Sequence, residues 1–213
     1  MTVTRARTRA WTIPPDRGAI LAFVRRATTI RTAPAGRAIQ RLPVKTPFGS
    51  PQVLWVVRQA PGWLGVISPI VGNGRVGWIP RPAASLRRTT WELLVSLSSR
   101  RLTVIDHGQV LERYTVAIGA PSSPTPTGRF AVTDRLVTRN PAGPYGCCIV
   151  ALSAVAPHAI QGWDGGDRIA IHTTPGNVGL GEAVTHGCMH VTMADGRWLL
   201  YHVPLGTPTL ISA

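Results

Sequence analysis

Short runs of β-branched and alternating residues, broken every few positions by glycine or proline, constrain the fold of this chain most. The 213 residues include 22 Gly and 19 Pro, which occupy turns more readily than the interiors of helices and strands. Hydrophobic residues make up 44% of the chain and charged residues 15%, so it carries enough apolar surface to bury a core. We therefore expect a mainly β fold with short connections.

The N-terminal part has the pattern of a small β-barrel, which we place at residues 28–82. Asn73-Gly74 stands between apolar runs and predicts a hairpin turn. Short strands at this density are typical of a small barrel. The predicted strands are Thr28–Arg31, Val53–Arg58, Leu64–Ile67 and Val76–Ile79, with turns at Pro34–Gly36, Pro47–Gly49 and Pro61-Gly62.

Two flanking segments lack this pattern and divide the chain. Residues 1–27 predict an irregular basic leader, and residues 83–90 predict a linker. A second β domain then covers residues 91–213, with a tight turn at His107-Gly108. Its predicted strands are Trp91–Leu97, Leu102–Asp106, Gln109–Ile118, Gly128–Thr138, Ile149–Leu152 and Arg168–His172.

The second domain contains the single predicted helix. Thr192 is a good N-cap, and Asp195 three residues later gives an arrangement like a capping box. Pro204 ends the helix, and a last strand is expected at Thr207–Ile211. The chain should therefore be mainly β, with one short helix near its C-terminus.

Net positive charge is confined to the first part of the chain. Residues 1–90 contain fourteen Arg and Lys45 against Asp16 alone, whereas residues 91–213 contain eight Arg and eight acidic residues. A basic half predicts an anionic partner, although a general bias toward arginine would give the same composition. The basic residues are scattered and lack a nucleic-acid signature, so we expect no nucleic acid, while a membrane surface and an anionic polymer both remain open.

The sequence indicates neither a membrane span nor a secretory signal. No apolar run approaches the roughly 20 residues that cross a bilayer, so we expect no transmembrane segment. Residues 1–17 are basic and polar, and the apolar stretch from Ala19 to Val24 is too short for a signal core. No signal segment is therefore visible.

The reactive side chains gather in residues 171–190. His172 ends a predicted strand, and a Gly-rich loop leads to Thr185-His186-Gly187-Cys188-Met189-His190. Attack on a carbonyl needs a thiolate, a base and donors for the oxyanion. Cys188 supplies the sulfur and His172 the imidazole, while Gly187 lets the backbone turn so that neighbouring amides face one point. The cluster thus predicts a Cys–His nucleophile.

Two other interpretations of the cluster remain open. His172, His186, Cys188 and His190 could bind zinc, although a bend between the last three would prevent them from sharing one face. The second interpretation is a buried cysteine among histidines that have no shared function. Between these interpretations and the Cys–His nucleophile, we expect no metal or cofactor. The odd, low number of cysteines argues against a disulfide framework. Cys147-Cys148 lies outside the cluster and is interpreted as packing, with a redox role as the alternative.

The segment from His172 to His190 resembles the signature of YkuD-type L,D-transpeptidases, which is a His, a loop, and then Ser/Thr-x-Gly-Cys-apolar-Arg/Asn. Other blocks of this family are resembled in the same order along one domain. They are Val95–Val104, Thr115–Gly119, Pro124–Phe130, Gly143–Gly146 and Leu205–Ile211.

This resemblance implies a YkuD-type β-sandwich with a short helix after the cysteine, acting on peptidoglycan stem peptides without a cofactor. Cys188 would attack a tetrapeptide stem, and His172 would be the general base, oriented by the backbone carbonyl of Thr173. Amides of His186, Gly187 and Cys188 would form the oxyanion hole. The thioester acyl-enzyme would pass to an amine, giving a cross-link, or to water, giving a tripeptide. Members of the family are typically acylated by carbapenems.

Substrate contacts are expected at Tyr145, Thr173, Thr185 and His190. The family usually has Arg or Asn at position 190, so His190 leaves the substrate preference and the rate open. A wall-binding protein that has lost catalysis is the remaining alternative.

The segment from Leu42 to Ile79 resembles bacterial Src-homology-3-like domains through Gly62-Trp63-Leu64 and Gly77-Trp78-Ile79. Such domains often accompany cell-wall enzymes. The resemblances together imply a monomer in the cell envelope, outside the cytoplasm, whose basic part contacts anionic wall polymers.

Overall fold

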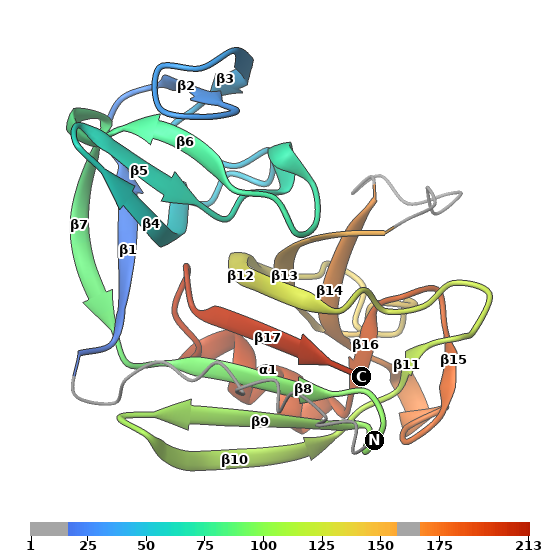
Figure 1. The fold of residues 1–213 in the computed structure, drawn as a ribbon. Coiled ribbons are helices and arrows are strands. Elements are labelled where there is room, and N and C mark those ends of the chain that lie inside the picture. The colour runs from blue at the N-terminus through green and yellow to red at the C-terminus, as the bar shows by residue number, and fades with distance from the viewer. Residues whose placement is uncertain (1–16, 157–166) are drawn as a thin grey trace, which may run out of the picture.

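The computed structural model describes residues 17–156 and 167–213, which form two large sheets, a small two-stranded sheet and one α-helix (Figure 1). The mainly β prediction is therefore confirmed. Within these residues no helix is long and apolar enough to span a membrane.

The first sheet is antiparallel throughout and belongs to the N-terminal part. Its strands are β1 (Ala19–Val24), β2 (Thr28–Arg31), β3 (Ala38–Leu42), β4 (Val53–Ala60), β5 (Trp63–Val66), β6 (Gly77–Pro80) and β7 (Ala84–Thr89). They lie in the order β3-β2-β6-β5-β4-β1-β7. Alternating side chains such as Leu54 and Ile79 point inward and are fully buried, which gives this sheet a core of its own.

Two segments that we expected to be irregular are strands of this sheet. β1 lies inside the predicted leader and β7 inside the predicted linker, and they pair antiparallel with Leu21 opposite Arg87. The predictions of irregular structure are wrong for these strands, because the two short segments satisfy each other's backbone groups by pairing across the sheet. Residues 1–16 of the leader lie outside the described residues.

The hairpin predicted around Asn73-Gly74 is confirmed in its strands and in the turn at these two residues, but its connection is longer than a two-residue turn. β5 and β6 are antiparallel neighbours, but residues 67–76 join them through the short 3-10 helix Pro69–Val71. The Asn73 side chain also forms two hydrogen bonds with the backbone of Val155, donating to its carbonyl over 2.7 Å and accepting from its amide over 2.9 Å. An asparagine amide can therefore mark a contact between segments distant in sequence as well as a turn.

The second sheet is built from the C-terminal part. Its strands are β8 (Glu92–Ser96), β9 (Arg101–Asp106), β10 (Gln109–Thr115), β12 (Gly128–Val137), β13 (Cys148–Val155), β14 (Arg168–Thr173), β16 (Met189–Val191) and β17 (Pro208–Ser212). They lie in the order β10-β9-β8-β17-β12-β13-β14-β16. His107 and Gly108 both have positive φ angles between β9 and β10, which confirms the predicted tight turn.

One long strand links the two halves of the second sheet. The first residues of β12 pair with β17 and the later ones with β13. The helix α1 (Met193–His202) begins after the Thr192 cap, which accepts from the Asp195 amide as predicted, and packs on β13 and β14. The small sheet contains β11 (Ile118–Gly119) and β15 (Ala183–Thr185).

The two large sheets pack against each other through a small apolar cluster. Trp55 of the first sheet is 1% exposed and shares this cluster with Ala131 of β12, against which Leu205 also packs. Gly206 has a positive φ angle, and a Cβ there would lie only 2.6 Å from a methyl group of Val53. Glycine at this position therefore permits the close approach of the two sheets.

Candidate active site

The reactive residues meet at one edge of the second sheet. β14 and β16 are parallel neighbours, with Ile171 opposite Met189 and His172 opposite His190. Cys188 directly precedes β16. Parallel pairing therefore brings the end of one strand and the start of the next to the same place, although many residues separate them in sequence.

A hollow of about 200 Å³ lies at this edge. Six of the eight predicted site residues line it: Tyr145, His172, Thr185, His186, Cys188 and His190. Pro144 and Val184 complete its lining. Thr173 and Gly187 do not line the hollow but contact residues that do.

His172 is held in one tautomer. Its ring is 3% exposed, and Nδ1 lies 3.0 Å from the carbonyl oxygen of Thr173, as predicted. A carbonyl can only accept, so Nδ1 donates and Nε2 of the neutral ring is left with a lone pair. The pKa of His172 is lowered to about 4, mainly by burial and also by the neighbouring His190, while the bond to Thr173 opposes both effects.

Cys188 is a free, buried thiol. It is 6% exposed and packs with the apolar side chains of Ile149, Ala151 and Ala170. This burial raises the pKa of Cys188 to about 11, while a hydrogen bond with the backbone of Ala170 opposes the shift. Near neutral pH the pair therefore consists of a thiol and a neutral imidazole, rather than a thiolate and an imidazolium.

The turn before the thiol is held by one hydroxyl. Thr185 Oγ1 donates to the Cys188 carbonyl over 2.6 Å and accepts from the Gly187 amide over 3.1 Å. This bond removes the Gly187 amide from the predicted oxyanion hole, because its N–H already donates within the turn. Among the described residues, the amides of His186 and Cys188 form no such bond and remain available.

Thr125 also holds this turn and was missed by the sequence analysis. Its hydroxyl donates to the Gly187 carbonyl over 2.9 Å and accepts from the Gly119 amide over the same distance. The Pro124–Phe130 block was the available signal, but it contributed only to the family resemblance and assigned Thr125 no role. Sequence does not indicate that this loop reaches a glycine sixty-two residues away.

Two rings flank the imidazole. The His190 ring lies 4.3 Å from that of His172 between ring centres, tilted by 52°. The Tyr145 ring meets it edge-on at 5.0 Å and 69°. Burial lowers the pKa of His190, and His186 lowers it further. His190 therefore contributes a neutral ring beside His172 near pH 7.

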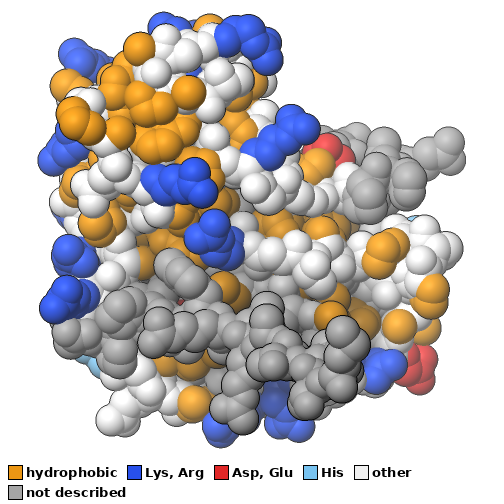
Figure 2. All heavy atoms as spheres, in the orientation of Figure 1, with side chains coloured by type: hydrophobic (Ala, Val, Ile, Leu, Met, Phe, Trp, Pro, Cys, Tyr) orange, Lys and Arg blue, Asp and Glu red, His pale blue; other side chains and the backbone are white. Residues whose placement is uncertain are grey.

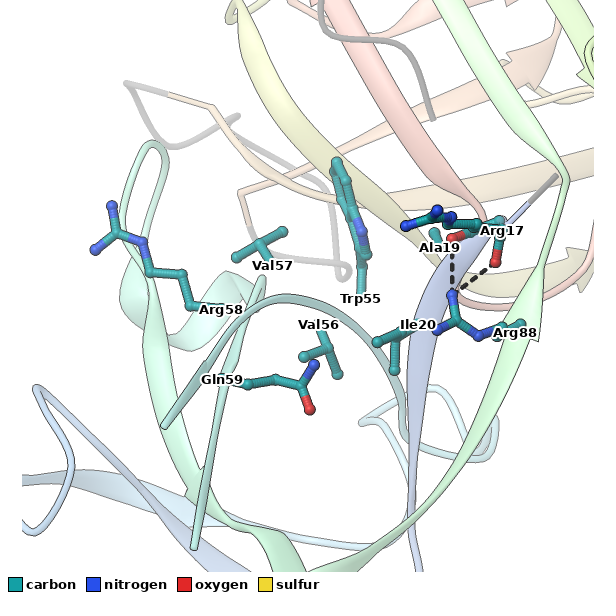
Figure 3. Close-up of a pocket in the computed structure, with 10 residues that line it drawn as sticks. Arg17, Ala19, Ile20, Trp55, Val56, Val57, Arg58, Gln59 and Arg88 are labelled. Atoms are coloured by element: carbon teal, nitrogen blue, oxygen red, sulfur yellow. Dashed lines mark hydrogen bonds between the residues drawn. The ribbon is translucent and has the colours of Figure 1, made fainter. Parts of the chain in front are cut away.

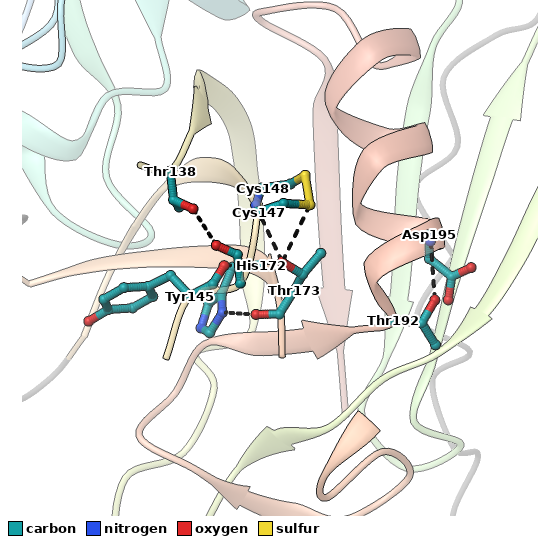
Figure 4. Close-up of a disulfide and its surroundings, with 9 residues drawn as sticks. Thr138, Tyr145, Cys147, Cys148, His172, Thr173, Thr192 and Asp195 are labelled. Carbon is teal, nitrogen blue, oxygen red and sulfur yellow. Dashed lines mark hydrogen bonds between the residues drawn. A yellow bond between two sulfur atoms is a disulfide. The ribbon is translucent and has the colours of Figure 1, made fainter. Parts of the chain in front are cut away.

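Cys147 and Cys148 are joined by a disulfide bond (Figure 4). The interpretation of this pair as packing holds for its burial but missed the bond, because a count of cysteines cannot distinguish two free thiols from a bond between neighbours. Both residues are buried, and the Cys148 amide donates to the hydroxyl of Thr173 over 3.3 Å. The disulfide thus contacts the residue that orients the histidine.

The parts of the chain that the structure describes contain no group of side chains suited to bind zinc. Among residues 17–156 and 167–213, no three His, Cys, Asp or Glu side chains are grouped so that they could hold a metal ion. The zinc interpretation therefore lacks support in the geometry, whereas the Cys–His interpretation has both residues in one hollow.

Comparison with known proteins agrees with this geometry. The family model for the L,D-transpeptidase catalytic domain, YkuD, matches residues 90–211. The YkuD proteins of Bacillus subtilis and Bacillus licheniformis, both named as L,D-transpeptidases, are 30% and 29% identical over 122 residues, which is 57% of this chain. The chain spans just under two thirds of these relatives, 66% of each.

The solved structures found to be similar include an L,D-transpeptidase from Mycobacterium smegmatis, with a TM-score of 0.45 and 22% identity over 65% of this chain and 73% of that one. Another is the L,D-transpeptidase LdtMt1 in complex with imipenem, with a TM-score of 0.48 and 18% identity over 92% and 99% of the two chains. The family model, which covers more than half of the sequence, carries the assignment. This chain belongs to the family of L,D-transpeptidases with a YkuD catalytic domain.

Proposed function

We propose that this protein is a peptidoglycan L,D-transpeptidase with Cys188 as its nucleophile. The observation that carries the proposal is the shared hollow, in which Cys188 and a histidine fixed as the Nδ1–H tautomer lie at one sheet edge. The free lone pair on Nε2 is the base that a neutral thiol requires. A metal-independent acyl transfer fits this set of groups.

The reaction proceeds through two acyl transfers. As the Cys188 sulfur bonds to the stem carbonyl, its proton passes to Nε2 of His172, and the carbonyl electrons move onto oxygen. The amides of His186 and Cys188 donate to this oxyanion. When the intermediate collapses, the imidazolium returns the proton to the departing terminal amino acid, and a thioester remains. An acceptor amine on a second stem then attacks the thioester, transfers its proton to His172 and releases the thiol.

Incubation with purified disaccharide-tetrapeptide, followed by mass spectrometry of the products, tests this function. We expect a cross-linked dimer and loss of all turnover in Cys188→Ala, with Cys147 and Cys148 unchanged. A tripeptide without dimer would instead establish a carboxypeptidase that uses water. Absence of both products, with retained sedimentation on peptidoglycan, would establish a wall-binding protein that has lost catalysis.

The disulfide supports a location outside the cytoplasm. Protein disulfides persist in oxidising compartments and are rare in the reducing cytosol. Peptidoglycan lies in the same extracytoplasmic space, so substrate and disulfide point to the cell envelope. We propose that the protein acts there as a monomer.

We further propose that the first sheet, as a Src-homology-3-like module, binds an anionic wall polymer. Residues 17–89 contain eleven Arg and Lys45 but no Asp or Glu. Lys and Arg side chains are spread over this part of the surface in Figure 2. A surface with so many cations and no carboxylate attracts polyanions over distances of about a Debye length.

Two hollows on the first sheet suggest where such a polymer is held. One, of about 430 Å³, is lined by Arg37, Arg58, Arg75 and Trp78, and these three guanidinium groups make no hydrogen bond or ion pair within the described residues. The other, of about 340 Å³, also includes Arg58 and lies beside Trp55 (Figure 3). A linear polyanion could therefore follow Arg58 from one hollow to the next.

Sedimentation with wall preparations before and after removal of phosphodiester polymers tests this binding. The variant R37Q/R58Q/R75Q should bind about tenfold more weakly to the untreated wall, because it loses three charge-assisted contacts. The matched control R26Q/R41Q/K45Q removes the same charge outside the 430 Å³ hollow and should bind almost normally. Equal loss in both variants would mean that net charge alone, and not the hollow, determines binding.

A further inference from the structure

The turn that carries the disulfide is attached to the orienting residue of the histidine. Thr173 is fully buried, and its hydroxyl contacts three atoms of this turn: the Tyr145 carbonyl at 3.1 Å, the Cys148 amide at 3.3 Å and the Cys147 sulfur at 3.8 Å. A hydroxyl has one proton, so it donates to the Tyr145 oxygen and accepts from the Cys148 amide. The sulfur then lies in close packing contact.

Thr173 cannot move away from this arrangement. A Cβ at Gly146 would collide with its hydroxyl, and a Cβ at Gly196 of α1 would collide with its methyl group. The side chain is therefore enclosed between the turn on one side and the helix on the other. Its carbonyl, on the same residue, accepts the Nδ1–H of His172.

The same turn also places the ring that packs on the imidazole. Tyr145 lies two residues before the disulfide, and its ring contacts that of His172 edge-on (Figure 4). The following residue, Gly146, accepts a hydrogen bond from the hydroxyl of Thr138, which ties the turn to the end of β12. The position of Tyr145 thus depends on the backbone that the disulfide closes.

We infer that the Cys147–Cys148 disulfide is a positioning element for the reaction, which holds His172 in its productive tautomer and orientation through Thr173 and Tyr145. A bond between adjacent side chains restricts the backbone of both residues, so the Cys148 amide and the Tyr145 carbonyl stay where one hydroxyl can bridge them. The burial of both sulfurs shields the bond from external thiols, which fits a permanent brace. This inference rests on the proposed acyl-transfer function.

The first experiment determines the chemical state of the cysteines. The protein is denatured without reductant, alkylated with iodoacetamide and weighed intact. One label, on Cys188, is expected, and three labels are expected after reduction with a dithiol. Three labels without reduction would overturn the inference, whatever the outcome for catalysis.

The second experiment measures acylation by a carbapenem across pH. C147S/C148S retains the nucleophile, and its first-order acylation rate should fall about tenfold or more, a typical cost of misplaced catalytic groups, with little change in apparent affinity. The acid limb of its pH profile should move up toward the ordinary histidine pKa as the imidazole becomes less enclosed. A variant that merely lost stability would keep the wild-type profile.

Matched variants separate positioning from packing. Thr173→Val keeps the disulfide but removes both hydrogen bonds of the hydroxyl, and it should reproduce the shifted profile, whereas Thr173→Ser should restore that of the wild type. Leu200→Ala removes apolar packing against the two cysteines and should lower thermal stability without shifting the profile. Wild-type rates and profile in both C147S/C148S and Thr173→Val would overturn the inference; absence of acylation in the wild type would instead overturn the proposed function.

Discussion

The rate at which a carbapenem acylates Cys188, measured from about pH 4 to about pH 11, tests the neutral thiol–imidazole pair directly. Burial lowers the pKa of His172 to about 4, so the base should remain neutral far into the acid range. The same burial raises the pKa of Cys188 to about 11, so the thiol should remain protonated far into the alkaline range. Between these limits the wild-type rate should be nearly constant.

The size of the acid effect follows from the two histidine pKa values. Near pH 5.5 an imidazole with the ordinary pKa of 6.5 is about one tenth neutral, whereas one with a pKa of about 4 is almost entirely neutral. The acylation rate near pH 5.5 should therefore be about ten times what an ordinary histidine base would permit.

The alkaline side is tested by His172→Ala. With a thiol pKa of about 11, about one molecule in ten thousand carries a thiolate at pH 7. Removing the base should therefore lower the neutral rate by about 10²–10⁴-fold, and the remaining rate should rise about tenfold per pH unit. His107→Ala is the control, because this exposed histidine lies in the turn after β9, outside the hollow.

Intact-protein mass spectrometry at timed intervals provides the rates. A wild-type acid limb centred near the ordinary histidine pKa would refute the argument that burial sets the state of His172. A flat profile in His172→Ala would refute the argument that the thiol depends on this base, and His186 would then be the next candidate.

Three further outcomes follow from the same structure. The free energy of unfolding, measured by urea denaturation, should be greatest between about pH 6.5 and about pH 9. Below this window the histidine of the unfolded chain binds a proton that His172 in the fold resists, and above it the thiol of the unfolded chain loses a proton that Cys188 in the fold retains. Each of these two effects should lower the free energy of unfolding by about 3 kcal/mol. Thr125→Val should leave the Gly119 amide without its partner and reduce the acylation rate about tenfold, whereas Thr125→Ser, which keeps the hydroxyl, should retain the wild-type rate. Equal rates in both variants would exclude Thr125 from positioning the turn. Gly187→Ala should reduce the acylation rate more than a hundredfold while the circular dichroism spectrum stays unchanged. The reason is that alanine is strained at a φ of +109° and its Cβ would lie 2.9 Å from Ile169. A wild-type acylation rate in this variant would mean that the turn accommodates alanine without cost.

Local patterns predicted most strands of the second sheet because each alternates on its own. Gln109–Thr115 and Gly128–Val137 could be recognised from a few consecutive residues and the turns that bound them. β1 and β7 were missed for the opposite reason. They are defined by pairing between residues 19–24 and 84–89, and neither stretch indicates that the other exists.

The candidate site divides in the same way. His172 and Cys188 could be predicted because the motif places an imidazole and a thiol in a recognisable order. Thr125 and the Cys147–Cys148 bond could not be predicted. A hydroxyl that bridges Gly119 and Gly187 and a bond between adjacent cysteines produce no repeating pattern in the sequence. The resemblance gave no sign that the Gly187 amide donates to Thr185, which only the geometry shows.

Burial explains why the proposed catalytic pair is neutral, and the excess positive charge of the chain lies in its first part. A fixed cation beside Cys188 would favour the thiolate and lower its pKa, as guanidinium groups do for nearby acids. Among the residues that the structure describes, no Arg or Lys lines the hollow, and His190, which does line it, also has a lowered pKa. The thiol must therefore be deprotonated during attack, which makes the fixed Nε2 lone pair a requirement rather than an aid. Arginine is instead concentrated on the first sheet, where it can bind a polyanion without altering the proton balance of the site.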